Sequence, residues 1–193
     1  MGSVTYFSAF DGIHGRELWK SDGTPSGTIM VKDIYPGTGN SNPTHLTNFN
    51  GTLFFVANDG VHAYELWQSD GTPAGTALFT EINVGIQDSL SSGVESGGEE
   101  IPMFVFNGYM YFNSNDQVHG DELWRTNGTP QGTVRWGPWG DASSFVRVDQ
   151  VFYFASSYDA NHTYLAEGRE VWKSDGTVIG TQLISDVHPQ AWV

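Results

Sequence analysis

Residues 17–28, Glu-Leu-Trp-Lys-Ser-Asp-Gly-Thr-Pro-Ser-Gly-Thr, decide the fold of this chain. Near copies of this stretch occur at residues 65–76, 122–133 and 170–181. The tryptophans of successive copies lie 48, 57 and 48 residues apart. Tandem units of this length are typical of β-propellers, in which each unit forms one four-stranded blade.

The unit around the second copy shows the expected blade most directly. It contains four runs rich in Phe, Tyr, Val and Thr, at residues 45–49, 52–57, 64–68 and 76–82. Asn-Gly and Asp-Gly pairs separate these runs, and such pairs tolerate the positive φ angles of hairpin turns. The third and fourth units repeat the scheme, so we expect four antiparallel strands per blade and no helix.

The two ends of the chain complement each other. The first unit opens at residue 4 without a leading strand, whereas residues 189–193 align with residues 43–47 at the start of unit two. We therefore expect an all-β, four-bladed β-propeller whose ring is closed by pairing of the C-terminal strand with the N-terminal blade. The alternative is an open array from a longer repeat protein.

This prediction treats residues 1–193 as a single β-propeller domain. The four repeats are expected at roughly 4–34 plus 189–193, 44–82, 103–136 and 144–187.

The repeated pattern resembles the ELWxxDGTxxGT tandem-repeat family of bacterial secreted or surface β-propeller proteins. The match departs at Asn127, which replaces Asp, and at Val171 and Val178, which replace Leu and Pro. The resemblance implies an extracellular or cell-surface protein, and it supplies no catalytic residues. The sequence as given begins without the basic and apolar segments of a secretory signal peptide.

Composition excludes several classes of partner. The chain has 22 acidic and 8 basic residues, a net charge of −14, and no cysteine. Nucleic acids and anionic membranes require clustered Lys and Arg, so we expect neither as a partner. No apolar run approaches the roughly 18 residues of a membrane span. We expect a monomer with no required cofactor.

The repeated residues themselves invite a metal-binding interpretation, because an Asp in each turn offers a hard oxygen ligand for calcium. One carboxylate per separate turn falls short of the six to eight ligands that calcium prefers, so a structural role in the turn is favoured. The residues assigned to the structural repeat are Glu17, Trp19, Asp22, Glu65, Trp67, Asp70, Glu122, Trp124, Asn127, Glu170, Trp172 and Asp175.

Three of the copies carry Asp and His just before the Glu, as in Asp11, His14 and Glu17. This combination could bind a metal or perform acid–base chemistry. Its recurrence in successive units favours a structural network instead. The Glu needs a hydrogen-bonding partner, and the turn backbone or the His is a candidate.

Specific activity is expected where the copies differ. The segment 83–102 contains the acidic residues Asp88, Glu95, Glu99 and Glu100, which are candidate calcium ligands or contacts for a basic partner. The alternative is a flexible acidic loop.

Two further departures contain aromatic and polar side chains that could hold a sugar ring. The candidate ligand-binding residues are Trp136, Trp139, Asp141, Tyr158, Asn161, His162 and Tyr164. The alternative is that these aromatic side chains pack between blades or fill the channel.

The sequence thus favours a non-enzymatic extracellular binding or matrix module, with a glycan or polysaccharide as ligand and calcium as a possible stabilising ion. A glycoside hydrolase with paired carboxylates is one alternative, although no asymmetric pair stands out. A purely structural module of a larger secreted protein is the other.

Overall fold

The structure is a computed structural model that describes residues 4–82, 103–158, 161, 163 and 168–185. The chain divides into two compact units, residues 1–100 and 101–193, and each is described by itself.

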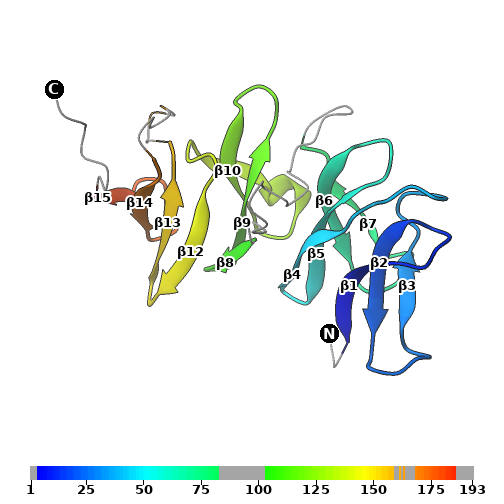
Figure 1. The fold of residues 1–193 in the computed structure, drawn as a ribbon. Helices are drawn as coiled ribbons and strands as arrows, with labels where there is room; N and C mark the ends of the chain where they lie inside the picture. Colours follow the sequence, from blue (N-terminus) through cyan, green and yellow to red (C-terminus); the bar gives the residue numbers. More distant parts are fainter. Residues whose placement is uncertain (1–3, 83–102, 159–160, 162, 164–167, 186–193) are drawn as a thin grey trace. The chain divides into compact units, whose positions relative to one another are not determined.

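The first unit contains two antiparallel sheets (Figure 1). The first sheet has three strands in the order β1-β2-β3, and the second has four in the order β4-β5-β6-β7. The strands are β1 (Thr5–Phe10), β2 (Arg16–Ser21), β3 (Ile29–Lys32), β4 (Thr44–Phe49), β5 (Thr52–Asn58), β6 (Tyr64–Ser69) and β7 (Ala77–Thr80).

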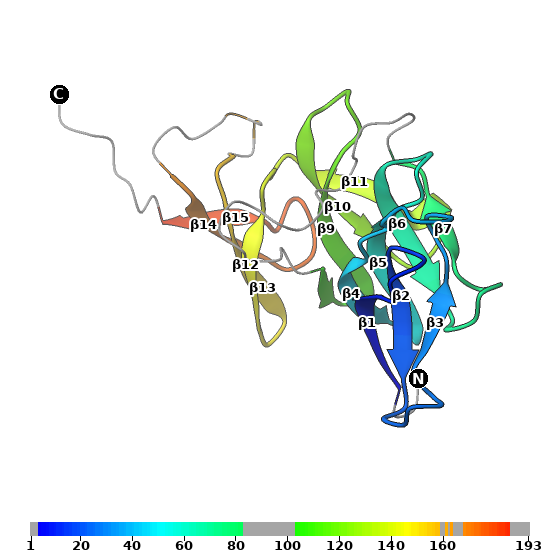
Figure 2. The ribbon, with the colours of Figure 1, turned by 45° about the vertical axis from the view of Figure 1, so that its right-hand side comes forward.

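The second unit contains two four-stranded antiparallel sheets, in the orders β8-β9-β10-β11 and β12-β13-β14-β15 (Figure 2). A single turn of 3-10 helix, η1 (Pro130–Gly132), follows β10. The strands are β8 (Phe104–Phe106), β9 (Tyr109–Asn115), β10 (Asp121–Thr126), β11 (Val134–Gly137), β12 (Ser143–Val148), β13 (Val151–Ser156), β14 (Glu170–Ser174) and β15 (Gln182–Ser185).

The Glu-Leu-Trp copies, the last of which reads Glu-Val-Trp, lie on β2, β6, β10 and β14, that is on the second strand of the first sheet and the third strand of each four-stranded sheet. In all four sheets the register between this strand and the next shifts between the Leu or Val and the Trp. Such an irregularity bends the strand and increases its twist. The repeated sequence therefore produces the same local distortion four times.

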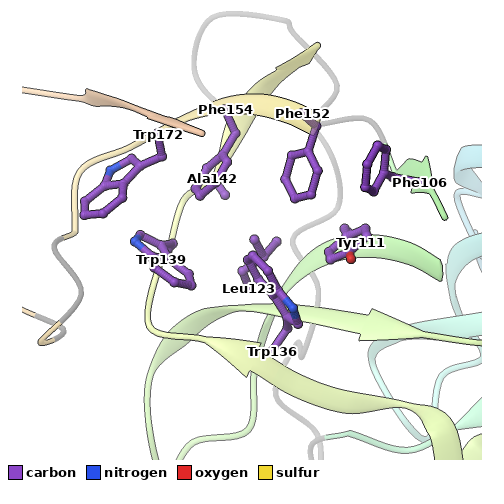
Figure 3. Close-up of a cluster of buried hydrophobic side chains, with 9 residues drawn as sticks. All are labelled: Phe106, Tyr111, Leu123, Trp136, Trp139, Ala142, Phe152, Phe154 and Trp172. Carbon is purple, nitrogen blue, oxygen red and sulfur yellow. The ribbon is translucent and has the colours of Figure 1, made fainter. Parts of the chain in front are cut away.

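The core of each unit lies between its two sheets. In the first unit, Leu18 and Val31 of the first sheet join Phe55 and Trp67 of the second in one buried cluster. The second unit has a more aromatic cluster, shown in Figure 3. Each sheet thus buries one face against its neighbour within the unit, as layered β-proteins require.

The all-β class, the four sheets and the antiparallel pairing are confirmed. The first sheet has three strands, because the described residues supply no strand before β1. No helix in the described ranges has the length and apolar character needed to cross a membrane.

Candidate functional site

The Asp-Gly-Thr turns are closed by hydrogen bonds among their own residues. In the first copy, Asp22 Oδ1 accepts hydrogen bonds from the Thr24 N–H and hydroxyl at 2.9 and 2.7 Å. The Thr24 hydroxyl oxygen accepts one from the Gly27 N–H at 2.9 Å. A Cβ on Gly27 would lie 1.9 Å from Asp22 Oδ1. The motif therefore requires a side-chain acceptor oxygen, Thr and the second Gly together.

The third copy shows that this turn does not require a negative charge. Asn127 Oδ1 accepts the same two hydrogen bonds, from the N–H and hydroxyl of Thr129, at 3.0 and 2.8 Å. Asp70 and Asp175 repeat the arrangement of Asp22. An acceptor oxygen is thus sufficient, which supports the structural alternative over calcium coordination.

The Glu of the repeat fastens the segment that links one sheet to the next. Glu17 is fully buried, and its carboxylate accepts hydrogen bonds from the Ile34 N–H at 2.8 Å, the Ser41 N–H at 3.2 Å and the Ser41 hydroxyl. Glu65 accepts one from the Ile82 N–H at 3.2 Å. Burial raises the pKa of Glu17. The carboxylate thus finds its partners in the inter-sheet linker.

Glu122 occupies the same position in the third copy and is also buried. It forms an ion pair with Arg135, whose Nη1 lies 2.9 Å from Glu122 Oε2.

Each Asp–His pair holds the tip of a hairpin. Asp11 Oδ1 accepts hydrogen bonds from the N–H groups of Ile13 and His14, and Asp11 Oδ2 lies 2.6 Å from His14 Nδ1. The contacts with the His14 backbone and ring lower the pKa of Asp11 to about 2. The bond to Asp11 raises the pKa of His14. The pairs Asp59–His62 and Asp116–His119 repeat this geometry.

Two of the proposed sugar-stacking residues lie in the core. Trp136 and Trp139 are 4% and 1% exposed, and their ring centroids are 5.2 Å apart. Figure 3 shows them among Phe152, Phe154 and Trp172. Their indole rings are therefore covered by protein, which supports packing between sheets over sugar stacking.

Asp141 lies in the linker that leads to β12, at a positive φ of 52°. Its Oδ1 accepts a hydrogen bond from the Ser157 N–H at 2.9 Å, and its Oδ2 lies 3.5 Å from Arg169 Nε. Tyr158 is half-buried and Asn161 is exposed, and both are held by further interactions. These three residues are engaged with the protein itself.

The other predicted ligand residues lie outside the described residues. These are His162, Tyr164, Asp88, Glu95, Glu99 and Glu100. Within the described part of the chain, no three His, Asp or Glu side chains are grouped as metal ligands would be.

A pocket of about 430 Å³ lies in the first unit, where the linker between the two sheets passes the β1–β2 hairpin. We call it the linker pocket, and it is lined by Phe10, Arg16, Thr38, Asn40 and Asn42. Its volume falls within the range of small-molecule sites. Phe10 is 62% exposed at the end of β1. The pocket thus combines one accessible aromatic ring with polar side chains.

Backbone contacts around Arg16 fix the linker against the hairpin. The Arg16 N–H donates to Asn40 Oδ1 at 2.8 Å, and the Arg16 carbonyl accepts from the N–H groups of Ser41 and Asn42 at 3.0 and 3.1 Å. Gly15 allows this close approach, because a Cβ there would lie 1.7 Å from the Gly39 carbonyl oxygen. The pocket wall is therefore held by both strands and linker before any ligand binds.

These bonds leave specific groups for a ligand. The Asn40 side chain uses its oxygen for the Arg16 N–H, so its NH₂ group can donate to a ligand. Asn42 Nδ2 donates to the Tyr64 hydroxyl at 2.9 Å, so its carbonyl oxygen can accept. Donors, an acceptor, a hydroxyl from Thr38 and an aromatic face therefore line one cavity.

Sequence reasoning placed the candidate sites elsewhere and missed the linker pocket. A signal was present in the linker length, since Asn50 follows Thr28 by 22 positions, whereas the equivalent Asp149 follows Thr133 by 16. A second signal was Phe10, which stands where the next two copies have Asn58 and Asn115.

No family model and no curated protein sequence matches this chain. Among solved structures, the chain is similar to a puromycin hydrolase, with a TM-score of 0.60 and 14% identity over 98% of this chain and 28% of that chain. It is also similar to a prolyl endopeptidase, with a TM-score of 0.53 and 13% identity over 94% of this chain and 24% of that one.

Prolyl oligopeptidase B from Galerina marginata gives a TM-score of 0.52 and 12% identity, over 95% of this chain and 25% of that enzyme. The chain thus spans about a quarter of the length of these three proteins. At such identities the similarity shows the fold alone, and that fold is β-propeller-like.

Proposed function

We propose that this protein is a non-enzymatic glycan-binding module and that the linker pocket is its binding site. The observation that carries the proposal is the composition of the pocket. Phe10 offers an exposed apolar face on which a sugar ring can lie, and Thr38, Asn40 and Asn42 offer hydroxyl and amide groups to its hydroxyls. A few convergent polar groups beside an aromatic surface are typical of small-molecule sites.

The state of the nearby carboxylates favours binding over hydrolysis. Asp11 and Glu17 adjoin the pocket residues Phe10 and Arg16 in sequence. Asp11 is paired with His14, and Glu17 is buried and bonded to the linker. A glycosidase needs two carboxylates available to the substrate, and these two are engaged by His14 and by the linker.

Titration of a panel of oligosaccharides against wild type and Phe10→Ala tests the proposal. We expect Phe10→Ala to weaken binding about tenfold, because the loss of a well-packed aromatic contact commonly costs more than 1 kcal/mol. Ile13→Ala is a matched control, since Ile13 is 67% exposed on the same hairpin and does not line the pocket. Absence of binding by wild type to every oligosaccharide in the panel would refute the proposal.

We further propose that the ring closes through the C-terminal segment. Support comes from the three-stranded first sheet beside three four-stranded sheets, and from the alignment of residues 189–193 with residues 43–47. Deletion of residues 189–193 should then reduce amide hydrogen-exchange protection in β1. Unchanged protection in β1 would count against closure and in favour of an open array.

The proposed setting is extracellular, and its support is the resemblance of the four copies to repeats of secreted bacterial proteins.

Calcium binding by residues 83–102 remains a prediction. Calorimetric titration of the chain with calcium would test it, and heats no larger than those of dilution would remove it.

A further inference from the structure

Among the Lys and Arg side chains of the first unit, Arg16 makes the weakest hydrogen bonds within the described residues. Residues 1–100 contain three Lys and Arg residues, Arg16, Lys20 and Lys32. Lys20 Nζ donates to the Gly71 carbonyl at 2.8 Å, and Lys32 Nζ donates to the Thr76 carbonyl at 2.7 Å. Both lysines thus hold the two sheets of the unit together, whereas Arg16 lines the pocket.

The guanidinium of Arg16 has little engagement with the protein. Among the described residues, its one side-chain hydrogen bond is a long contact of 3.5 Å from Nη1 to the Ser8 carbonyl. No described carboxylate lies within 4.0 Å of it, in contrast to Arg135, which is paired with Glu122. A positive group with free donors therefore borders the cavity.

The internal repeat provides a direct comparison. Arg169 precedes Glu170 as Arg16 precedes Glu17. Arg169 is engaged by Asp141, at 3.5 Å, and by the Ser143 hydroxyl, at 2.8 Å. The same position in the repeat is thus neutralised in the second unit, whereas in the first no carboxylate of the described residues pairs with it.

From these observations we infer that the linker pocket selects acidic sugars, with Arg16 binding a uronate carboxylate while Phe10 contacts the ring. The inference rests on the proposed glycan-binding function and names its ligand class. A guanidinium presents parallel N–H donors that match a carboxylate in a bidentate geometry. Asn40 and Asn42 would form hydrogen bonds with the neutral hydroxyls of the same sugar.

The overall charge of −14 does not prevent such binding. At physiological ionic strength, charges more than about 8 Å apart are largely screened. The distant carboxylates therefore contribute mainly to a slower approach of the anion. The two carboxylates next to the pocket residues in sequence are already engaged, since Asp11 is paired with His14 and Glu17 is bonded to the linker.

The test compares trigalacturonate with its fully methyl-esterified form, which keeps the rings and removes the charges. Calorimetric titration of wild type, Arg16→Gln and the matched control Arg169→Gln with both trimers gives six dissociation constants. We expect Arg16→Gln to weaken trigalacturonate binding about tenfold, a typical loss for one charge-assisted contact. Binding of the ester should be the same for wild type and Arg16→Gln, and Arg169→Gln should leave both trimers unaffected.

The outcomes separate this inference from the proposed function. If wild type binds both trimers equally and Arg16→Gln changes neither constant, selection for acidic sugars is refuted and glycan binding stands. If wild type binds neither trimer but binds neutral oligosaccharides in a way that depends on Phe10, the inference also fails alone. If wild type binds no oligosaccharide of either kind, the proposed function fails and the inference fails with it.

Discussion

At the scale of single residues, the buried Glu of the repeat anchors backbone outside its own strand. In the first copy, the buried carboxylate of Glu17 accepts hydrogen bonds from the Ile34 and Ser41 N–H groups of the linker between the two sheets. Buried N–H groups that lose their acceptor are costly, because water cannot replace it. Glu17 therefore fixes where the first linker leaves one sheet for the next.

Glu17→Gln should destabilise the protein by about 1–3 kcal/mol, since the amide keeps one acceptor oxygen and turns an NH₂ group toward a backbone donor.

The stability of wild type should also depend on pH through Glu17, because burial raises the pKa of Glu17 above its ordinary value of 4.5. The stability linked to this raised pKa is complete below pH 4.5 and is lost as the pH rises through the shifted pKa. Urea unfolding at several pH values would measure both effects.

Ser41→Ala provides the control through a double-mutant cycle with Glu17→Gln. Coupling between the two changes is expected, because the Ser41 hydroxyl donates to this carboxylate. Equal stability of wild type and Glu17→Gln, with no coupling, would show that the carboxylate does not fasten the linker.

At the scale of elements, three hairpins carry the same Asp–His fastening at their tips. The Asp accepts two backbone N–H groups and orients the His ring, as in Asp11 and His14. In the pair Asp11–His14, each partner is favoured in its charged form, so acid weakens the pair by protonating Asp11 and base weakens it by deprotonating His14.

Asp11→Asn should move the titration midpoint of His14 down toward its ordinary pKa of 6.5, because the bond to the Asp11 carboxylate raises the pKa of His14. The contribution of His14 to stability is complete below pH 6.5 and is lost as the pH rises through its raised pKa. That of Asp11 is complete above pH 3.8 and is lost as the pH falls through about 2.

Proton NMR of the His ring signals would follow this titration. His62, whose pKa is raised by its bond to Asp59, is the internal reference and should not respond to Asp11→Asn. A midpoint for His14 that is the same in wild type and variant would contradict the pairing.

Neighbouring sheets within a unit are joined by a basic side chain that reaches across to the next Asp-Gly turn. Lys20 donates to the Gly71 carbonyl at 2.8 Å, and Arg125 donates to the Gly176 carbonyl at 3.1 Å, both over 51 positions in sequence. The same contact thus recurs in both units.

Lys20→Met should lower the free energy of unfolding by about 1 kcal/mol, because the alkyl chain is kept and the Gly71 carbonyl loses its donor. Lys20→Arg should retain most of the stability, since Arg125 makes the equivalent contact in the second unit. Chemical denaturation of the three proteins would measure this. A Lys20→Arg variant as unstable as Lys20→Met would assign the effect to the shape of the site and not to the hydrogen bond.

The strands and turns could be predicted from the sequence because their signals are local. The runs expected at residues 45–49, 52–57, 64–68 and 76–82 correspond to β4, β5, β6 and β7, with small shifts at their ends. The Asn50 turn has the expected positive φ, 52°. Short-range propensity and turn chemistry are sufficient for such elements.

At the scale of the whole molecule, the candidate site depends on contacts that the sequence does not display. Trp136 and Trp139 lie in an apparent interruption of the repeat, yet they fill the core between two sheets. The linker pocket instead arises where a long linker lies against a hairpin some 24 positions earlier in the chain, through Asn40 and Arg16. Local periodicity cannot reveal such a pairing, although the extra linker length marked the segment.

The hydrogen bonds of Asn127 show that the fold of this turn does not depend on an acidic side chain. Because an amide oxygen closes the turn in the third copy, changing Asp22, Asp70 and Asp175 to Asn would remove three negative charges and keep the oxygen that closes each turn. Folding therefore does not require a negative charge at these turns. The charge there can instead follow from selection for solubility or for the protein's surroundings. The same freedom allows the protein's colloidal behaviour to be redesigned at these three positions while the blade scaffold is left intact.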